Sequence, residues 1–131
     1  MHFAVALSLL FFVPVHSGPF GSFKPADAGG AAHSDRVEFY ASVIAGAARA
    51  EKICEGYRTN VTVLPGVRAK MAIRVEDRPE VSRQVQQGER MVSDQIEHIG
   101  VASWCAAVLR IFGPNGSIVP GLLELRVRRR P

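Results

Sequence analysis

The sequence has few of the residues from which catalytic and metal sites are usually built. Its 131 residues include only two cysteines and four histidines. Neither cysteine belongs to a CxxC pair, because Cys54 is followed by Glu-Gly-Tyr and Cys105 by Ala-Ala-Val. Structural zinc sites, redox motifs and haem attachment sites need such close spacing. We therefore predict a protein that is not an enzyme, with no metal and no cofactor.

The body of the chain also lacks an excess of either charge. Sixteen Lys and Arg stand against twelve Asp and Glu, and the whole difference lies in four arginines near the C-terminus: Arg126, Arg128, Arg129 and Arg130. A domain that binds nucleic acid carries positive charge on the fold itself, so no nucleic-acid partner is expected. We expect this basic tail (126–131) to be loose. Its arginines are candidates for binding a protein partner or an anionic membrane, where each would contribute about 1 kcal/mol of binding free energy. The alternative is a tail that is only solvated.

No Lys or Arg precedes the first apolar run, which extends from Phe3 to Val13. The run itself, a following Pro14 and a small residue at Ser17 are nevertheless typical of a secretory signal peptide. The run is too short for a membrane-spanning helix, which needs about 20 residues. We predict a signal peptide over 1–17 and a secreted or periplasmic location, with an uncleaved anchor or a misassigned start codon as alternatives.

Two thiols in an oxidising compartment are expected to pair if geometry permits. A disulfide between Cys54 and Cys105 would close a loop of about 52 residues, which the chain-entropy estimate values at about 4 kcal/mol. The competing interpretation is a reactive Cys105. It would need a nearby histidine, and only His98, with Asp94 on the same helical face, is placed to serve. We predict the structural disulfide.

The mature chain is predicted to hold one helical domain over 34–125, after a Gly- and Pro-rich linker over 18–33. Its first helix is expected to be amphipathic, to run for about 20 residues and to carry Cys54 on its apolar stripe. Asp35 and Glu38 have the form of a capping box, which predicts a start at Ser34 or Asp35.

Residues 60–75 fit two interpretations. The alternation of apolar and basic residues from Val67 to Val75 is typical of an edge strand, whereas a helix beginning near Pro65 would bring Leu64, Val67 and Met71 together. A lone strand would find no partner elsewhere in the chain. We therefore favour a short helix.

A third helix is predicted after Asp77, which can cap it, with Pro79 in the first turn and Glu80 complementing the helix dipole. With Glu76, these carboxylates also form a candidate pair for acid–base chemistry, although their place at a helix start explains them without catalysis. Gly88 lies on the apolar seam of this helix and predicts either a close helix crossing or a kink.

The fourth predicted helix, 101–112, carries apolar residues around nearly its whole circumference, so we expect it to form the centre of the core. Gly113 should end it with a left-handed cap, and Leu122 and Leu123 should fold back over the bundle. The predicted fold class is therefore all-α: a small bundle of three to four helices closed by one disulfide.

Three short stretches resemble known proteins: Glu51 to Tyr57, Ser103 to Ala107 and Phe112 to Gly116. With them, the chain from about Asp35 to Leu123 resembles a family of short, uncharacterised bacterial exported proteins with two cysteines. The resemblance implies an all-helical fold and a Cys54–Cys105 bridge, but no activity. In format alone, a leader, helices and one long-range disulfide, the chain is also similar to small periplasmic acid-stress chaperones.

The leading functional hypothesis is a non-enzymatic secreted or periplasmic binding protein, and an envelope-stress or chaperone-like protein is one version of it. The alternative is an interaction or inhibitor protein that uses the basic C-terminal tail. A third interpretation, a small enzyme, would depend on His98.

Overall fold

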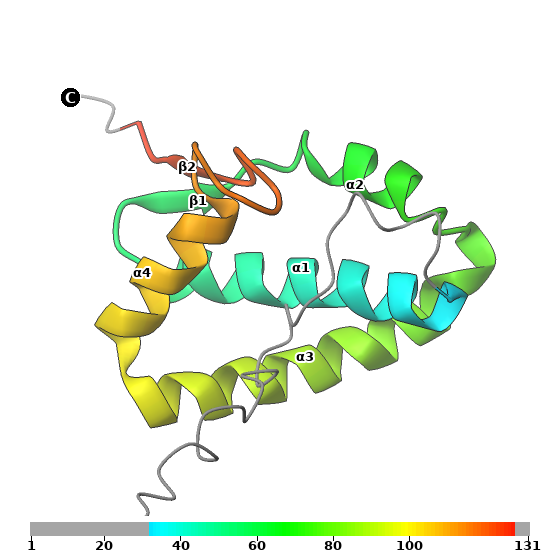
Figure 1. Cartoon of the computed structure of the whole chain (residues 1–131), viewed down its shortest axis with the longest axis horizontal. Helices are drawn as coiled ribbons and strands as arrows, with labels where there is room; N and C mark the ends of the chain where they lie inside the picture. The colour runs from blue at the N-terminus through cyan, green and yellow to red at the C-terminus, as the bar shows by residue number, and fades with distance from the viewer. Residues whose placement is uncertain (1–31, 128–131) are drawn as a thin grey trace, which may run out of the picture.

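The computed structural model describes residues 32–127, which form helices and one small sheet (Figure 1). In chain order the elements are α1 (His33–Ile53), β1 (Tyr57–Thr59), α2 (Leu64–Lys70), the 3-10 turn η2 (Val75–Asp77), α3 (Arg78–Ile99), α4 (Val101–Phe112) and β2 (Leu123–Leu125). The predicted small helical bundle with one disulfide is confirmed. The predicted signal peptide, the linker as far as residue 31 and residues 128–131 lie outside the described residues.

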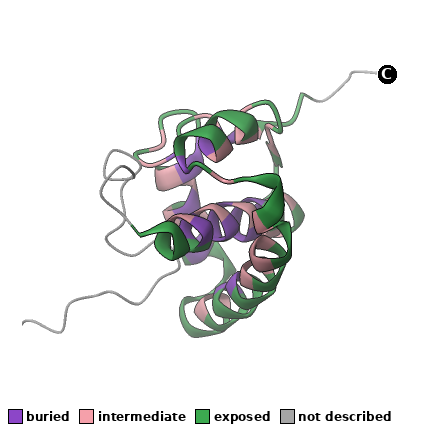
Figure 2. Ribbon diagram, turned by 90° about the vertical axis from the view of Figure 1, so that its right-hand side faces the viewer, coloured by how far each residue is buried: buried purple, intermediate pink, exposed green. Residues whose placement is uncertain are grey.

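Helix α1 lies at the centre of the molecule, in contact with α3, α4 and both strands (Figures 1 and 2). Its buried residues are Val37, Phe39, Ala41, Ser42, Val43, Ala45, Gly46, Ala47 and Ala50. Most of them are small, and small side chains let neighbouring backbones approach from more than one side. The buried part of α1 is therefore wider than the predicted apolar stripe.

Helix α4 is buried on one face only, so the prediction that it forms the centre of the core is wrong. Trp104, Val108 and Phe112 are buried, whereas Val101 is 48% exposed. The helix lies across one end of the bundle (Figure 1) and finds neighbours on one side. A helix with apolar residues on all sides is expected to be buried, but it can be buried only on the sides where other elements pack against it.

The sheet was not predicted. Strands β1 and β2 are antiparallel, with Tyr57 opposite Leu125 and Thr59 opposite Leu123. The prediction that a strand would find no partner elsewhere in the chain concerned residues 60–75. It overlooked the C-terminal segment, which folds back and pairs with residues 57–59. The short helix expected near Pro65 is confirmed as α2.

Two helix ends differ from their predicted form. Helix α1 begins at His33, and the carbonyl of Ala32 accepts the backbone N–H groups of Asp35 and Arg36 at 3.0 and 3.1 Å. Asp35 thus lies inside the first turn, where it complements the helix dipole, and no side chain caps the helix. Gly113 ends α4 with an extended backbone (φ −66°) rather than a left-handed one.

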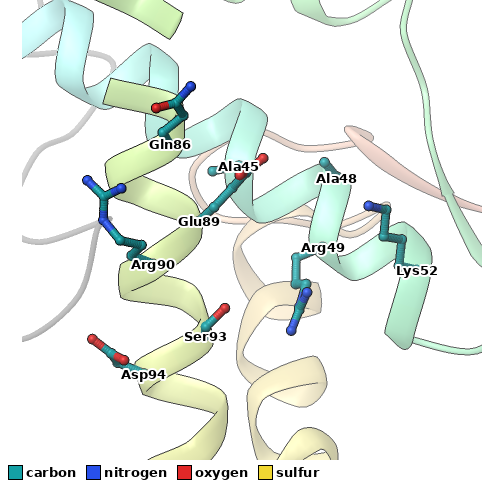
Figure 3. A pocket seen from close by; sticks show the side chains of 9 residues that line it. All are labelled: Ala45, Ala48, Arg49, Lys52, Gln86, Glu89, Arg90, Ser93 and Asp94. Atoms are coloured by element: carbon teal, nitrogen blue, oxygen red, sulfur yellow. The ribbon is translucent and has the colours of Figure 1, made fainter. Parts of the chain in front are cut away.

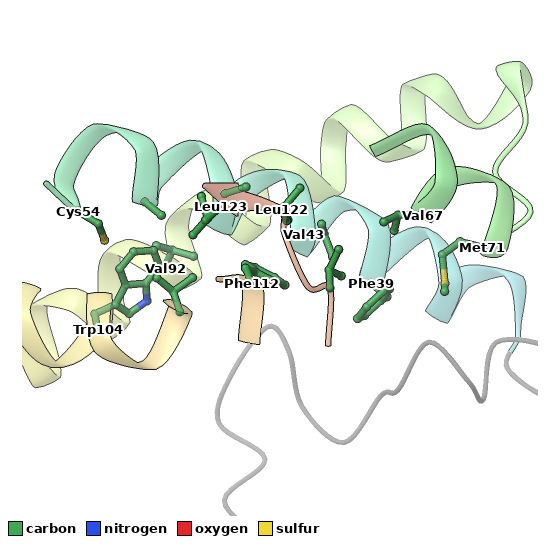
Figure 4. Close-up of a cluster of buried hydrophobic side chains, with 14 residues drawn as sticks. Phe39, Val43, Cys54, Val67, Met71, Val92, Trp104, Phe112, Leu122 and Leu123 are labelled. Atoms are coloured by element: carbon green, nitrogen blue, oxygen red, sulfur yellow. The ribbon is translucent and has the colours of Figure 1, made fainter. Parts of the chain in front are cut away.

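One apolar cluster joins α1, α2, α3, α4 and the C-terminal segment (Figure 4). Its fully buried side chains include Val43 of α1, Met71 directly after α2, Val92 of α3, Phe112 of α4 and Leu122 of the C-terminal segment. The predicted return of the chain after α4 over the bundle is confirmed by this burial. Since all four helices and the C-terminal segment contribute to the same cluster, the domain has a single core.

Gly88 marks a close crossing of α3 and α1, one of the two outcomes predicted for it. A Cβ atom at Gly88 would lie 3.1 Å from the Cβ of Ala45 and 3.9 Å from the Cα of Ser42. The 3.1 Å contact is tighter than ordinary van der Waals distance, so even a methyl group at Gly88 would require a small shift of the helices, and a larger side chain a larger one.

Replacing Gly88 by leucine is therefore expected to push α1 and α3 apart and to lower the free energy of unfolding by about 1–3 kcal/mol. Urea unfolding followed by circular dichroism measures the change. The matched control is Gly66→Leu in α2, where an added Cβ meets no atom within 4 Å. Equal losses in the two variants would contradict the close crossing.

Candidate functional site

The disulfide joins the end of the central helix to α4. The sulfur atoms of Cys54 and Cys105 are 2.09 Å apart and their Cα atoms 5.6 Å apart, across 51 positions of the sequence. Cys54 follows α1 directly and is buried, and Cys105 lies within α4. The predicted pairing is confirmed, and it leaves no free thiol in the chain.

The residues considered for chemistry around Cys105 do not form a reactive cluster. Cys105 is covalently bonded, and His98 is exposed in the last turn of α3. Asp94 instead lines a groove between α3 and α1. Within the described part of the chain, no group of three or more His, Cys, Asp or Glu side chains is placed to hold a metal ion.

The carboxylates Asp77 and Glu80 at the start of α3 accept hydrogen bonds, but the prediction that Asp77 caps this helix is wrong. The Asp77 side chain makes no cap hydrogen bond to α3 and bonds the backbone at the start of η2 instead. Asp77 accepts a hydrogen bond from the backbone N–H of Arg74 at 2.7 Å and one from Nε2 of His33 at 2.9 Å. These bonds, the first most strongly, hold the pKa of Asp77 below its usual value. Glu80 accepts hydrogen bonds from Arg83 and Gln84, which lower the pKa of Glu80.

Asp77 is expected to make the stability of the fold depend on pH in the acid range. Its folded-state pKa lies below the unfolded value of about 3.9, so its contribution is present above that pH and is lost as pH falls through the folded pKa. Asp77→Asn should be less stable than the wild type at pH 6 and should converge with it near pH 2. Urea unfolding from pH 2 to 6 tests this, with Asp94→Asn on the same helix as control. Parallel curves for wild type and Asp77→Asn would contradict it.

A groove of about 610 Å³ runs between α1 and α3; we call it the polar groove (Figure 3). Helix α1 contributes Ala45, Ala48, Arg49 and Lys52, and helix α3 contributes Gln86, Glu89, Arg90, Ser93 and Asp94. The small alanines make room for the groove beside the crossing at Gly88, and the charged side chains surround it. The sequence analysis missed it, because charges on two separate helices look like ordinary solvated faces.

The charges of the polar groove are not neutralised by one another. In the described part of the chain, the ion pairs His33–Asp77, Arg58–Glu124 and Glu80–Arg83 involve no groove residue. The Nε atom of Arg49 is moreover buried without an acceptor. A buried donor left without a partner costs about 1–3 kcal/mol. An acceptor that reaches this Nε after the Arg49 side chain turns would remove that cost.

Of the four arginines named as a candidate site, the structure places only Arg126, and it is not loose. Its N–H donates to the carbonyl of Gly56, its Nε to that of Tyr57 and its Nη2 to that of Glu51, each at 2.8 Å. Arg126 thus holds the turn that follows α1. A cation is favourable at this place, because the carbonyl groups at a helix C-terminus carry partial negative charge. Arg128, Arg129 and Arg130 lie outside the described residues.

No family model, curated protein or solved structure matches this chain. The resemblance to short exported two-cysteine proteins therefore stays a prediction. Between residues 32 and 127, no helix is both long enough and apolar enough to cross a membrane.

Proposed function

We propose that the protein is a secreted or periplasmic binding protein that acts without catalysis and receives a charged segment of a partner protein in the polar groove. The observation that carries this proposal is the buried Nε of Arg49, which has no acceptor in a groove whose other charged groups also lack ion pairs. A partner carboxylate would satisfy Arg49 by a charge-assisted hydrogen bond.

The proposed compartment has two supports. The Cys54–Cys105 disulfide is compatible with an extracellular or periplasmic location. The sequence begins with a segment typical of a secretory signal peptide. An exported binding protein of this size gains from a covalent link, because a small core alone gives a modest free energy of unfolding.

The charges around the groove favour a segment with charges of both signs. Arg49 and Lys52 from α1 suit carboxylates, whereas Glu89 and Asp94 from α3 suit basic side chains. Segments with both signs are common in unfolded chains, so the chaperone-like version of the function, in which clients are held against aggregation, is compatible with this groove.

The test is the suppression of aggregation of a heat-aggregating client enzyme, measured by light scattering from pH 2 to 7. The wild type is expected to suppress it, and Arg49→Gln should need about tenfold more protein for the same effect, the ratio that one charged hydrogen bond gives. The control is Arg110→Gln, which removes the same charge from an exposed position in the last turn of α4. Absence of suppression at every pH, or full activity of Arg49→Gln, would refute the proposal.

The second candidate is binding through the C-terminal tail. It is favoured by the three hydrogen bonds of Arg126, which fix the point where the basic tail leaves the fold, and by the exposed Leu125 (62%) and Val127 (79%) on either side of it. A chain that ends after Arg126 should lose its captured partner, and Arg49→Gln should keep it. The opposite pattern would favour the groove.

A further inference from the structure

Helix α2 is flanked by two hollows on different sides of the helix. The first, of about 260 Å³, lies between α2 and residues 118–120 and has Val67, Met71 and Val119 in its lining; we call it the Lys70 hollow. The second, of about 470 Å³, is lined by Tyr40, Leu64 and Ile73, among others, and by Arg68; we call it the Arg68 hollow. Residues 63, 66, 67 and 70 of the first and 64, 65, 68 and 69 of the second follow helical spacing, which separates the two faces.

The floor of the Lys70 hollow belongs to the core. Met71 is fully buried, Val119 is 5% exposed and Val67 is 9% exposed. Gly66 lies at the open side, where an added Cβ would meet nothing within 4 Å. The apolar surface that a ligand in this hollow could cover therefore belongs to Val63 and Ile118, which pack against the central cluster, and to Pro120.

Each hollow has one charged lining residue, and in both it is a cation. Lys70 lines the first and Arg68 the second, and no carboxylate lines either. Neither cation takes part in an ion pair of the described chain. The sequence gives the reason, since it holds no Asp or Glu between Glu55 and Glu76.

An apolar hollow with one unpaired cation is complementary to an anionic amphiphile. Apolar surface removed from water on both partners favours binding, and a carboxylate accepts a charge-assisted hydrogen bond from an ammonium group. A cationic ligand would be repelled, and a neutral sugar would leave its hydroxyl groups without partners against the apolar floor.

We propose that the Lys70 hollow binds a single-chain anionic amphiphile of the fatty-acid class, with its apolar chain along Val63 and Ile118, above the buried Met71, and its carboxylate at Lys70. The Arg68 hollow repeats the same composition on the neighbouring face of α2. This site is separate from the polar groove, and its occupancy does not depend on the function proposed for that groove.

The methionines allow a localised test, because Met71 lines the hollow and Met91 lies on α3. With 13C-methyl methionine in the full chain, decanoate below its micelle-forming concentration is titrated in, and the methyl signals of Met71 and Met91 are followed by NMR. The Met71 signal is expected to shift with saturation, and the Met91 signal to stay in place. No shift of Met71, or equal shifts of both signals, would overturn the proposal.

Three variants distinguish the contribution of the Lys70 charge to binding from that of the cavity. Lys70→Gln should bind decanoate about tenfold more weakly, and Gly66→Leu should remove binding by filling the open side of the hollow. Lys52→Gln in the polar groove is the matched control and should bind as the wild type does. An added Cβ at Gly66 meets no atom within 4 Å, so Gly66→Leu is expected to keep the fold, and circular dichroism checks this.

Two further ligands test whether the charge is needed for binding and whether the ligand is a free molecule or a membrane surface. Decanol, which has the same chain and no charge, should shift Met71 only at about tenfold higher concentration. Equal affinity for decanol would overturn the role of Lys70. A shift of Met71 with phosphatidylglycerol vesicles and none with free decanoate would assign this face to a membrane surface and would likewise overturn a site for single molecules.

Discussion

Replacing both Cys54 and Cys105 by alanine is expected to lower the free energy of unfolding by about 4 kcal/mol. The bond closes a span of 51 residues, so its loss returns a large conformational entropy to the unfolded chain. It also fixes α4, which packs on one face only, to the end of the central helix. Urea unfolding at neutral pH, monitored by circular dichroism and by the fluorescence of Trp104, measures the change.

Reduction provides the matched control for this prediction. A reducing agent should destabilise the wild type by a similar amount and should leave the double-alanine variant unchanged. Since small domains have total stabilities of about 5–15 kcal/mol, this loss takes away a large share of the total. A wild type that unfolds at the same urea concentration with and without reductant would contradict the structural role of the bond.

Phe112→Ala is the point substitution with the largest expected effect, a loss of about 3–5 kcal/mol. Phe112 is fully buried at the end of α4 and belongs to the cluster that also contains Val43 of α1 and Leu122 of the returning segment (Figure 4). Truncation would leave a cavity where these elements meet. The same unfolding measurement gives the value.

Val101→Ala on the same helix serves as the comparison for Phe112→Ala. Val101 is 48% exposed, and surface substitutions of this kind change stability by about 0.5 kcal/mol or less. A small effect at Val101 and a large one at Phe112 would confirm that α4 is buried on one face. Similar losses at the two positions would contradict it and would support the burial on most sides that the sequence pattern predicted.

The sequence predicted a structural feature correctly where that feature depends on neighbouring residues or where a residue has only one possible partner. Two cysteines allow one intramolecular pairing, so Cys54 and Cys105 could be joined without any knowledge of the packing. Pro79 favours the first turn of a helix, and α3 begins there. Gly88 allows a close approach of another helix, and α3 crosses α1 at this residue. The short helix near Pro65 likewise depends on neighbours in the chain.

Interactions between distant segments could not be predicted in the same way. Strand β1 exists because residues 123–125 return to it, and three-residue strands show no alternation that would reveal them. The central place of α1 depends on small residues that have weak apolar character and allow close approach. The charges of the polar groove come from two helices that meet only in the folded molecule. No local sequence motif therefore indicated Arg49 as a candidate binding residue.

The two proposed binding regions occupy separate parts of the scaffold. The polar groove lies between α1 and α3, and the Lys70 hollow lies between α2 and the loop after α4. Arg49→Gln and Lys70→Gln should therefore have independent effects, each on its own ligand. Loss of both activities in either variant would point to a change in the fold instead of a change at one site.

The central claim is that the chain is a helical scaffold closed by one covalent bond. Mass spectrometry of the native protein, alkylated without reduction and digested, tests it most directly. The account predicts a mature chain beginning at Gly18 and a cross-linked pair of peptides that contain Cys54 and Cys105. Two alkylated cysteines on separate peptides would contradict the account.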